Sequence, residues 1–210
     1  MEKRQTVNVR DMVEMALFTA IIVVLASTPL GYIPITPAIG ATTMHIPVII
    51  AGVVLGWKKG AITGFLFGLT SFLRASFFAP GITSFLFSPL QPGGNFCSLV
   101  ICFIPRILIG VVSAFVFKAL VKVIKNETGS LAIAGLCGSM TNTILVMGMT
   151  YIFFSKQFAE AVGQEVGTVL NYIIGSVIIT NGIPEAIVAA IITTAVGKAL
   201  LVVIRKRNLE

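Results

Sequence analysis

Charged residues are scarce in this sequence of 210 residues, of which 11% are Asp, Glu, Lys or Arg and 56% are hydrophobic. A soluble domain carries roughly 25% charged residues. Several stretches approach or exceed the ~20 apolar residues that are needed to cross a bilayer. No polar stretch is long enough to build a separate soluble domain, so the sequence predicts a single membrane domain over residues 1–210.

Motifs of enzyme chemistry are absent as well. The sequence has no G-x-x-x-x-G-K-[ST] loop, which excludes ATP use by that route. It has neither H-E-x-x-H nor G-x-S-x-G. One histidine and a single acidic residue deep in the apolar spans leave too few groups for an intramembrane hydrolase or a metal-dependent transferase. We therefore expect no catalysis, no metal and no cofactor.

Cysteine is also rare, and Cys97, Cys102 and Cys137 all lie in apolar segments. None of them forms a C-x-x-C pair, so neither a metal site nor a disulfide is predicted. We interpret them as buried thiols that pack as small hydrophobic groups. The N-terminus is not followed by a small-residue cleavage site, so the first apolar segment is expected to be a retained helix.

Proline and glycine divide the chain into six apolar spans, which predict an all-α bundle of six transmembrane helices. The expected spans are Met12–Thr28, Met44–Trp57, Gly60–Phe78, Phe96–Lys118, Ser130–Phe154 and Ile173 to just before Arg205. A tight turn is expected at Lys58–Gly60. The proline-rich stretches 29–43, with Pro37, and 79–95 predict ordered loops, and the spacing of apolar residues in 155–172 predicts a short surface helix.

The basic residues predict the orientation of the bundle. If the first helix runs outward, 12 of the 15 Lys and Arg residues fall on one side. They are Lys3, Arg4, Arg10, Lys58, Lys59, Lys118, Lys122, Lys125, Lys198, Arg205, Lys206 and Arg207. The positive-inside rule then places both termini in the cytoplasm and the segments 29–43, 79–95 and 155–172 outside. Because the net charge of +7 comes from the ends of apolar spans, it does not indicate nucleic-acid binding.

Seven polar residues are expected between the middle of the membrane and its external surface. They are His45, Arg74, Arg106, Asn142, Thr143, Asn181 and Glu185. Polar and ionisable groups at such depth usually face a cavity or a partner. Their common depth beneath three external segments favours a binding cavity for a ligand from outside.

Structural roles for the same residues stay open at this point. Arg106 and Glu185 could pair with each other and lock two helices together. The two asparagines could form hydrogen bonds between helices. His45 could anchor a loop, and Arg74 could extend to the membrane surface.

Small residues recur at helical spacing. Gly52, Gly56, Gly60, Gly64 and Gly68 stand four residues apart, which predicts close packing of the second and third helices with their neighbours. A second pair of small residues, Ala16 and Ala20, lies in the first helix. On an outward face, this pair would suit the docking of another membrane subunit.

Taken in order along the chain, these features resemble the substrate-binding S components of energy-coupling factor (ECF) vitamin transporters. The resemblance covers nearly the whole chain. It rests on Ala16-x-x-x-Ala20, on residues 44–52 (MHIPVIIAG) with Leu55–Gly56, on Gly60–Ala61 through Gly68, on Pro105–Arg106 with Gly110, on Asn142–Thr143, and on Asn181 with Glu185. The central stretch is most similar to the pantothenate-type members.

The resemblance implies a protein of the bacterial plasma membrane that binds one water-soluble vitamin near its external face. The loop between the first two helices would cap the vitamin. A transmembrane coupling protein and two ATPase subunits would be its partners, and the bundle would topple in the membrane to deliver the ligand. Ala16 and Ala20 match the surface that meets the coupling protein.

The residues are compatible with pantothenate. Its carboxylate requires a buried cation, and Arg106 is the deepest one, with a guanidinium suited to a bidentate pair. Asn142, Thr143 and Asn181 can serve its hydroxyls and amide, and Glu185 can accept a hydroxyl or orient Arg106. One Trp and three Tyr disfavour riboflavin. An S component for riboflavin, folate or cobalamin and a self-contained carrier of small anions remain alternatives.

Overall fold

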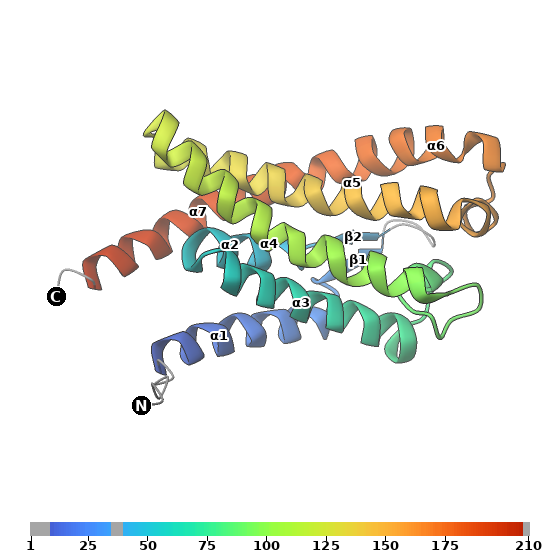
Figure 1. The fold of residues 1–210 in the computed structure, drawn as a ribbon, viewed down its shortest axis with the longest axis horizontal. Coiled ribbons are helices and arrows are strands. Elements are labelled where there is room, and N and C mark those ends of the chain that lie inside the picture. The colour runs from blue at the N-terminus through green and yellow to red at the C-terminus, as the bar shows by residue number, and fades with distance from the viewer. Residues whose placement is uncertain (1–8, 35–39, 208–210) are drawn as a thin grey trace, which may run out of the picture.

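The helices run lengthwise through the molecule and form an elongated bundle (Figure 1). The computed structural model describes residues 9–34 and 40–207. The helices are α1 (Val9–Ala26), α2 (His45–Leu55), α3 (Trp57–Leu73), α4 (Phe96–Ile124), α5 (Glu127–Val162), α6 (Val169–Tyr172) and α7 (Ile183–Arg207). Wide π-type turns at Arg74–Phe78 and Ile173–Gly182 and 3₁₀ turns at Ser84–Leu86 and Val166–Thr168 join or extend them. The predicted roles of Lys3, Arg4 and Pro37 lie outside the described residues.

Four helical stretches within 9–34 and 40–207 are long and apolar enough to cross a membrane. They are Trp57–Phe78, Phe96–Ile124, Glu127–Val162 and Val166–Arg205. Helix α2 has 11 residues, and at 1.5 Å per residue it spans roughly 17 Å, short of the ~30 Å hydrocarbon core. The predicted class of all-α membrane protein agrees with this arrangement, to which the structure adds a small hairpin.

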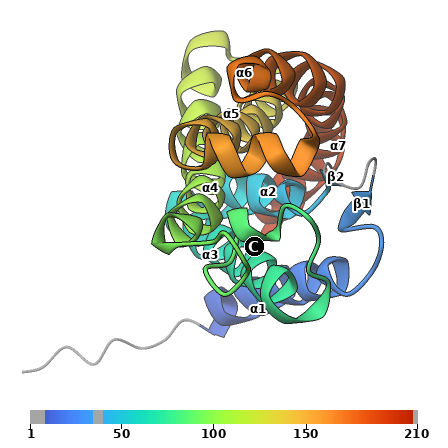
Figure 2. The ribbon, with the colours of Figure 1, turned by 90° about the vertical axis from the view of Figure 1, so that its right-hand side faces the viewer.

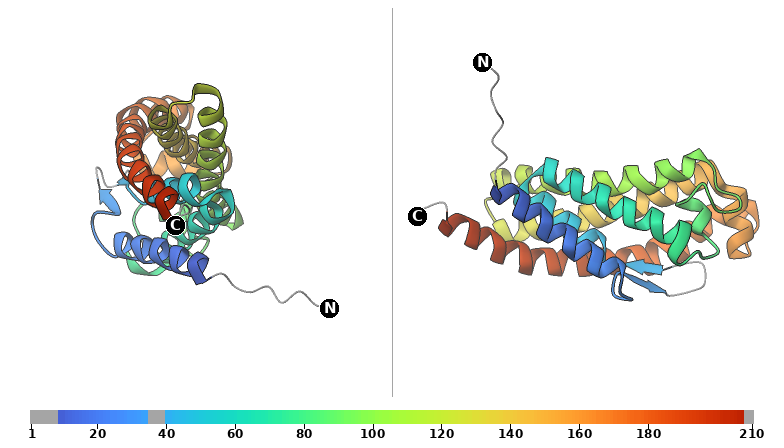
Figure 3. Two further views of the ribbon diagram at one scale, coloured as in Figure 1. Left: turned by 90° about the vertical axis from the view of Figure 1, so that its left-hand side faces the viewer. Right: turned by 90° about the horizontal axis from the view of Figure 1, so that it is seen from below.

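The hairpin lies in the segment that was predicted to be an ordered loop. Strand β1 (Tyr32–Pro34) pairs antiparallel with β2 (Gly40–Thr42), so that Tyr32 is opposite Thr42. The hairpin, the 79–95 segment and α6 lie toward one end of the bundle (Figure 2). Helix α1 begins and α7 ends at the other end, near the α2–α3 and α4–α5 turns (Figures 1 and 3).

The prediction of a short surface helix within residues 155–172 is wrong. Residues up to Val162 continue α5, after a break in helical geometry at Phe154, and Gly163 (φ 67°) ends that helix. Residues from Val166 onward begin the last helical stretch. The apolar spacing in this region belongs to the inner face of a long helix, because Phe158 is buried at 2% exposure against Phe154 and its neighbours.

Two other boundaries also differ from the prediction. The chain turns at Gly56 (φ 93°) and not at Lys58–Gly60, because only glycine adopts this backbone conformation without strain. The α4–α5 turn is shorter than expected. Helix α4 continues to Ile124, and the Asn126 side chain accepts a hydrogen bond from the Gly129 amide at the start of α5.

Glycine brings α3 and α4 into backbone contact, as predicted. A Cβ atom built on Gly64 would lie 2.1 Å from the carbonyl oxygen of Arg106, and one on Gly60 would lie 2.9 Å from that of Gly110. Gly56 is the exception in the series, because a Cβ atom there would meet nothing within 4 Å. The glycine contacts fix the position of α4 at the level of Arg106.

Candidate functional site

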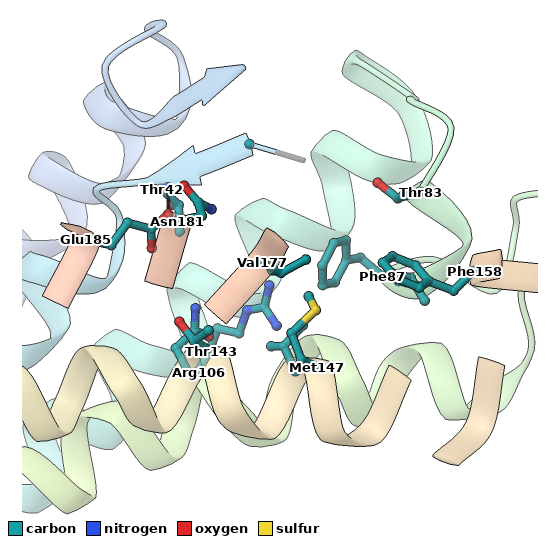
Figure 4. Close-up of a pocket in the computed structure, with 14 residues that line it drawn as sticks. Thr42, Thr83, Phe87, Arg106, Thr143, Met147, Phe158, Val177, Asn181 and Glu185 are labelled. Carbon is teal, nitrogen blue, oxygen red and sulfur yellow. Dashed lines mark hydrogen bonds between the residues drawn. The ribbon is translucent and has the colours of Figure 1, made fainter. Parts of the chain in front are cut away.

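A cavity opens between the hairpin, the 79–95 segment, α4, α5 and the last helical stretch (Figure 4). Its empty volume is about 690 Å³ when the part open to the outside is counted. The lining residues are Gly40, Thr42, Thr83, Leu86, Phe87, Arg106, Asn142, Thr143, Val146, Met147, Phe158, Val177, Asn181 and Glu185. Five of the seven predicted polar residues are among them.

Arg106 owes its position to the proline before it. Pro105 has no amide hydrogen, so the carbonyl of Ile101, four residues earlier, receives no helical hydrogen bond from that position. Arg106 Nη1 donates to this same Ile101 oxygen at 2.8 Å. The guanidinium is thereby fixed along α4 at one edge, and its other nitrogens remain available.

The guanidinium of Arg106 lies close to two aromatic rings. Its central carbon is 4.6 Å from the centre of the Phe87 ring and 5.4 Å from that of Phe67. The residue is 5% exposed, and its Nε atom is buried with no hydrogen-bond partner in the described part of the chain. The rings stabilise the cation by contact with their electron-rich faces.

Arg106 forms no ion pair with an acidic side chain of the described residues. Among residues 9–34 and 40–207, the ion pairs involve Lys59 and Arg205 and not this guanidinium. The pair of Arg106 with Glu185, considered from the sequence, does not form in the structure. The cavity therefore contains a buried positive charge with capacity for an anion.

Asn142 and Thr143 face the cavity from α5. Both are largely buried, and Asn142 Oδ1 has no hydrogen-bond partner among the described residues. Gly182 allows the opposite helical stretch to approach, because a Cβ atom there would lie 2.8 Å from Cγ2 of Thr143. The close approach brings polar groups of two helices to the same space.

Asn181 and Glu185 line the cavity next to strand β2 (Figure 4). The Thr42 amide donates to Glu185 Oε1 at 3.1 Å, so the hairpin is attached to α7 at the edge of the cavity. Asn181 belongs to the wide turns Ile173–Gly182, which precede Pro184. Proline supplies no amide for the regular helical pattern, and wide turns of this kind occur frequently at functional sites.

Several lining residues were not predicted from the sequence. Val146 and Met147 follow Asn142 and Thr143 by four residues, so helical spacing could have identified them. Phe158 was missed because α5 was expected to end before it. Thr42, Thr83 and Phe87 come from the hairpin and from the 79–95 segment, whose paths have no periodic signal in the sequence.

Arg74 lies in an adjoining hollow. Its guanidinium is 4.6 Å from the centre of the Tyr32 ring, and the Tyr32 hydroxyl is 3.0 Å from Ser71 Oγ. Burial raises the pKa of the Tyr32 hydroxyl, which keeps it protonated. Arg74 and Arg106 both line this hollow.

His45 and the small-residue pair of α1 lie elsewhere. His45 is 1% exposed at the start of α2, near the backbone of Thr42, and does not line the cavity. Ala16 and Ala20 are exposed on the outer side of α1. Their exposure leaves this face of α1 available for contact with a membrane partner or with lipid.

Comparisons with known proteins agree with one another. A sequence profile for the family described as "ECF transporter, substrate-specific component" matches residues 10–197. The chain is 38% identical over 196 residues to the pantothenic acid transporter PanT of Lactococcus lactis subsp. cremoris, covering 90% of this chain and 93% of the relative. It is 30% identical over 203 residues to the pantothenate transporter PanT of Leuconostoc mesenteroides, covering 92% and 93%.

Proposed function

The chain belongs to the family of substrate-specific components of ECF transporters, and we propose that it captures pantothenate for uptake into the cell. The sequence resemblance is confirmed at the level of the family. The pantothenate assignment is supported by two relatives that are named for this substrate. The chain is thus a multi-pass membrane protein with a transport role and not an enzyme.

The observation that carries the substrate proposal is the buried, unneutralised guanidinium of Arg106. A charge in this position is costly unless an anion compensates it. Pantothenate has one carboxylate, and a carboxylate bound to a guanidinium forms short, charge-assisted hydrogen bonds. The carboxylate would therefore bind at Arg106 and replace the missing counter-charge.

The other polar residues of the cavity suit the remaining groups of pantothenate. Pantothenate carries an amide, two hydroxyls and two methyl groups on one carbon. Asn142, Thr143 and Asn181 can donate hydrogen bonds to and accept them from the amide and hydroxyls, and Glu185 can accept a hydrogen bond from a hydroxyl. The methyl groups would contact apolar lining residues such as Met147 and Val177.

Six membrane crossings with both termini in the cytoplasm complete the proposal. The four long helical stretches would each cross once. Helices α1 and α2 would provide the other two crossings. The cavity would then face the outside of a bacterial cell, and the end rich in lysine and arginine would face the cytoplasm, as the positive-inside rule requires.

The partners in this proposal are a transmembrane coupling protein and two ATPase subunits. Membership of the ECF family supports them, because a substrate-specific component is one part of such a transporter. ATP hydrolysis would occur in the partners. We assign Ala16 and Ala20 to the surface that meets the coupling protein, since both are exposed and small.

Ligand specificity can be tested by thermal unfolding of the purified protein with pantothenate, riboflavin, folate and cobalamin. A ligand that binds the folded state raises the unfolding temperature by mass action. We expect pantothenate alone to do so. Stabilisation by another vitamin and not by pantothenate would retain the family and overturn the substrate.

Dependence on the partners can be tested with radiolabelled pantothenate in proteoliposomes. We expect accumulation only when the chain is reconstituted with the coupling protein, the ATPase subunits and ATP. Accumulation by the chain alone, at a comparable rate, would identify a secondary carrier and contradict the proposal.

A further inference from the structure

A second hollow adjoins the cavity, and we call it the outer chamber. It has an empty volume of about 550 Å³, counting the part open to the outside, and is lined by Tyr32, Ser71, Arg74 and Ser84 among others. Thr83, Phe87 and Arg106 line both the outer chamber and the cavity. The two spaces therefore meet at the guanidinium of Arg106 and the ring of Phe87.

The outer chamber has the chemistry of a carboxylate site. Arg74 stacks on Tyr32 and takes part in no ion pair within the described residues, so its charge is available to a ligand. Ser84 Oγ accepts a hydrogen bond from the Gly81 amide at 2.7 Å, which leaves its own hydrogen free to donate. A cation next to hydroxyl donors is suited to a small organic anion.

The two arginines lie at different depths. Arg74 begins the wide turn Arg74–Phe78, which follows α3 and directly precedes the 79–95 segment. The Arg106 guanidinium bonds to the carbonyl of Ile101, which lies five residues after the start of α4 at Phe96, or about 7.5 Å along the helix. An anion that arrives at the hairpin end thus meets Arg74 before Arg106.

We propose that the outer chamber is a transient binding site for the carboxylate of the incoming ligand, which then passes beside Phe87 to Arg106. The proposal rests on the proposed function, because it takes pantothenate as the anion. The site acts on the rate of association. A fixed positive charge near the opening raises the encounter rate of an anion, and this effect weakens as salt screens the charge.

The test measures association and dissociation rates of radiolabelled pantothenate on the full chain in nanodiscs of uncharged lipid. We expect Arg74→Gln to lower the association rate about ten-fold at low salt, to change the dissociation rate by less than about two-fold, and to flatten the salt dependence of association. Arg74→Lys keeps the charge and should restore most of the rate. Lys156→Gln removes an exposed cation of α5 and should change neither rate.

Each alternative result would overturn the proposal in a distinct way. An unchanged association rate in Arg74→Gln would mean that the outer chamber captures nothing. A faster dissociation with unchanged association would place Arg74 in the final bound state. An equally lowered association rate in Arg74→Lys and Arg74→Gln would assign the effect to the packing of Arg74 on Tyr32. Failure of the unmodified protein to bind pantothenate would instead refute the proposed function itself.

Discussion

The two ends of the bundle contain cations in opposite settings. At the end where α1 begins, Lys59 Nζ pairs with Asp11 at 2.5 Å and with Glu14 at 2.6 Å, and Arg205 pairs with Glu127 at 2.6 Å. At the cavity end, Arg106 is buried against two aromatic rings and pairs with no acidic residue of the described chain.

The difference separates two uses of charge. A partly exposed ion pair stabilises a fold by only about 0–1 kcal/mol. The ion pairs at the first end therefore contribute little to the stability of the protein. A buried cation without a counter-ion lowers the stability of the ligand-free protein, and an anion that pairs with it recovers that free energy. Under the proposed function, the charges at the first end have a structural role and Arg106 at the cavity end has a binding role.

Arg106→Met should give the largest effect. The substitution removes the charge and keeps an apolar side chain near Phe67 and Phe87, so pantothenate affinity should fall by about 100-fold or more. The ligand-free protein should unfold at the same or a higher temperature, because a buried charge is gone. Calorimetric titration and thermal unfolding measure the two quantities. A lower unfolding temperature with unchanged pantothenate affinity would show that Arg106 stabilises the fold and does not bind the ligand.

Gly64→Ala tests how the cavity end is positioned. The added methyl group would lie 2.1 Å from the Arg106 carbonyl, so α4 must move away from α3. We expect a loss of about 1–3 kcal/mol in the free energy of unfolding and weaker pantothenate binding.

Gly148→Ala is the matched control for this substitution. A Cβ atom at this position in α5 meets nothing within 4 Å, so stability should hold or rise. Equal losses in both variants would show that helix approach at Gly64 is not what positions Arg106.

Pro105→Ala should move stability and affinity in opposite directions. The restored amide can bond to the Ile101 oxygen that now accepts from Arg106 Nη1, and a proline is removed from the helix interior. Unfolding should therefore require a higher temperature, whereas pantothenate should bind about five-fold more weakly, the effect of roughly 1 kcal/mol. Unchanged affinity in a titration would mean that this hydrogen bond does not orient the guanidinium.

Lys59→Ala should give the smallest effect. It removes two partly exposed ion pairs, so the free energy of unfolding should fall by about 1 kcal/mol or less, and more at low salt than at high salt. Pantothenate affinity should not change, because Lys59 is at the opposite end. Lys58→Ala, next to it and in no ion pair of the described residues, serves as the control. A large drop in pantothenate affinity in Lys59→Ala would show that the ion pairs of the first end also affect binding at the cavity end.

The sequence alone predicted the class of protein and five of the polar residues that line the cavity. Charged and amide side chains stand out in apolar spans, which is why Arg106, Asn142 and Asn181 could be identified before their contacts were known. The even spacing of glycines predicted close helix packing, and the structure places Gly64 against the backbone of Arg106.

The other lining residues and the helix boundaries depend on local geometry that the periodicity of the sequence does not encode. Phe87 reaches Arg106 from an irregular segment, and Thr42 reaches Glu185 from a hairpin within a predicted loop. The wide turns at 173–182 depart from the 3.6-residue repeat on which helix prediction rests. The mixture of polar and apolar residues in 155–172 suggested a short surface helix, although α5 continues to Val162 and brings Phe158 to the cavity.

The most direct measurement compares two ligands on two proteins. Pantothenol has the hydroxyls and amide of pantothenate, but an alcohol replaces its carboxylate. Calorimetric titration should show that the unmodified protein prefers pantothenate by about 100-fold, since charge-assisted hydrogen bonds to the guanidinium exist for that ligand alone. Arg106→Met should bind both ligands with similar affinity. A preference for pantothenate that persists in Arg106→Met would place the carboxylate elsewhere and contradict the account.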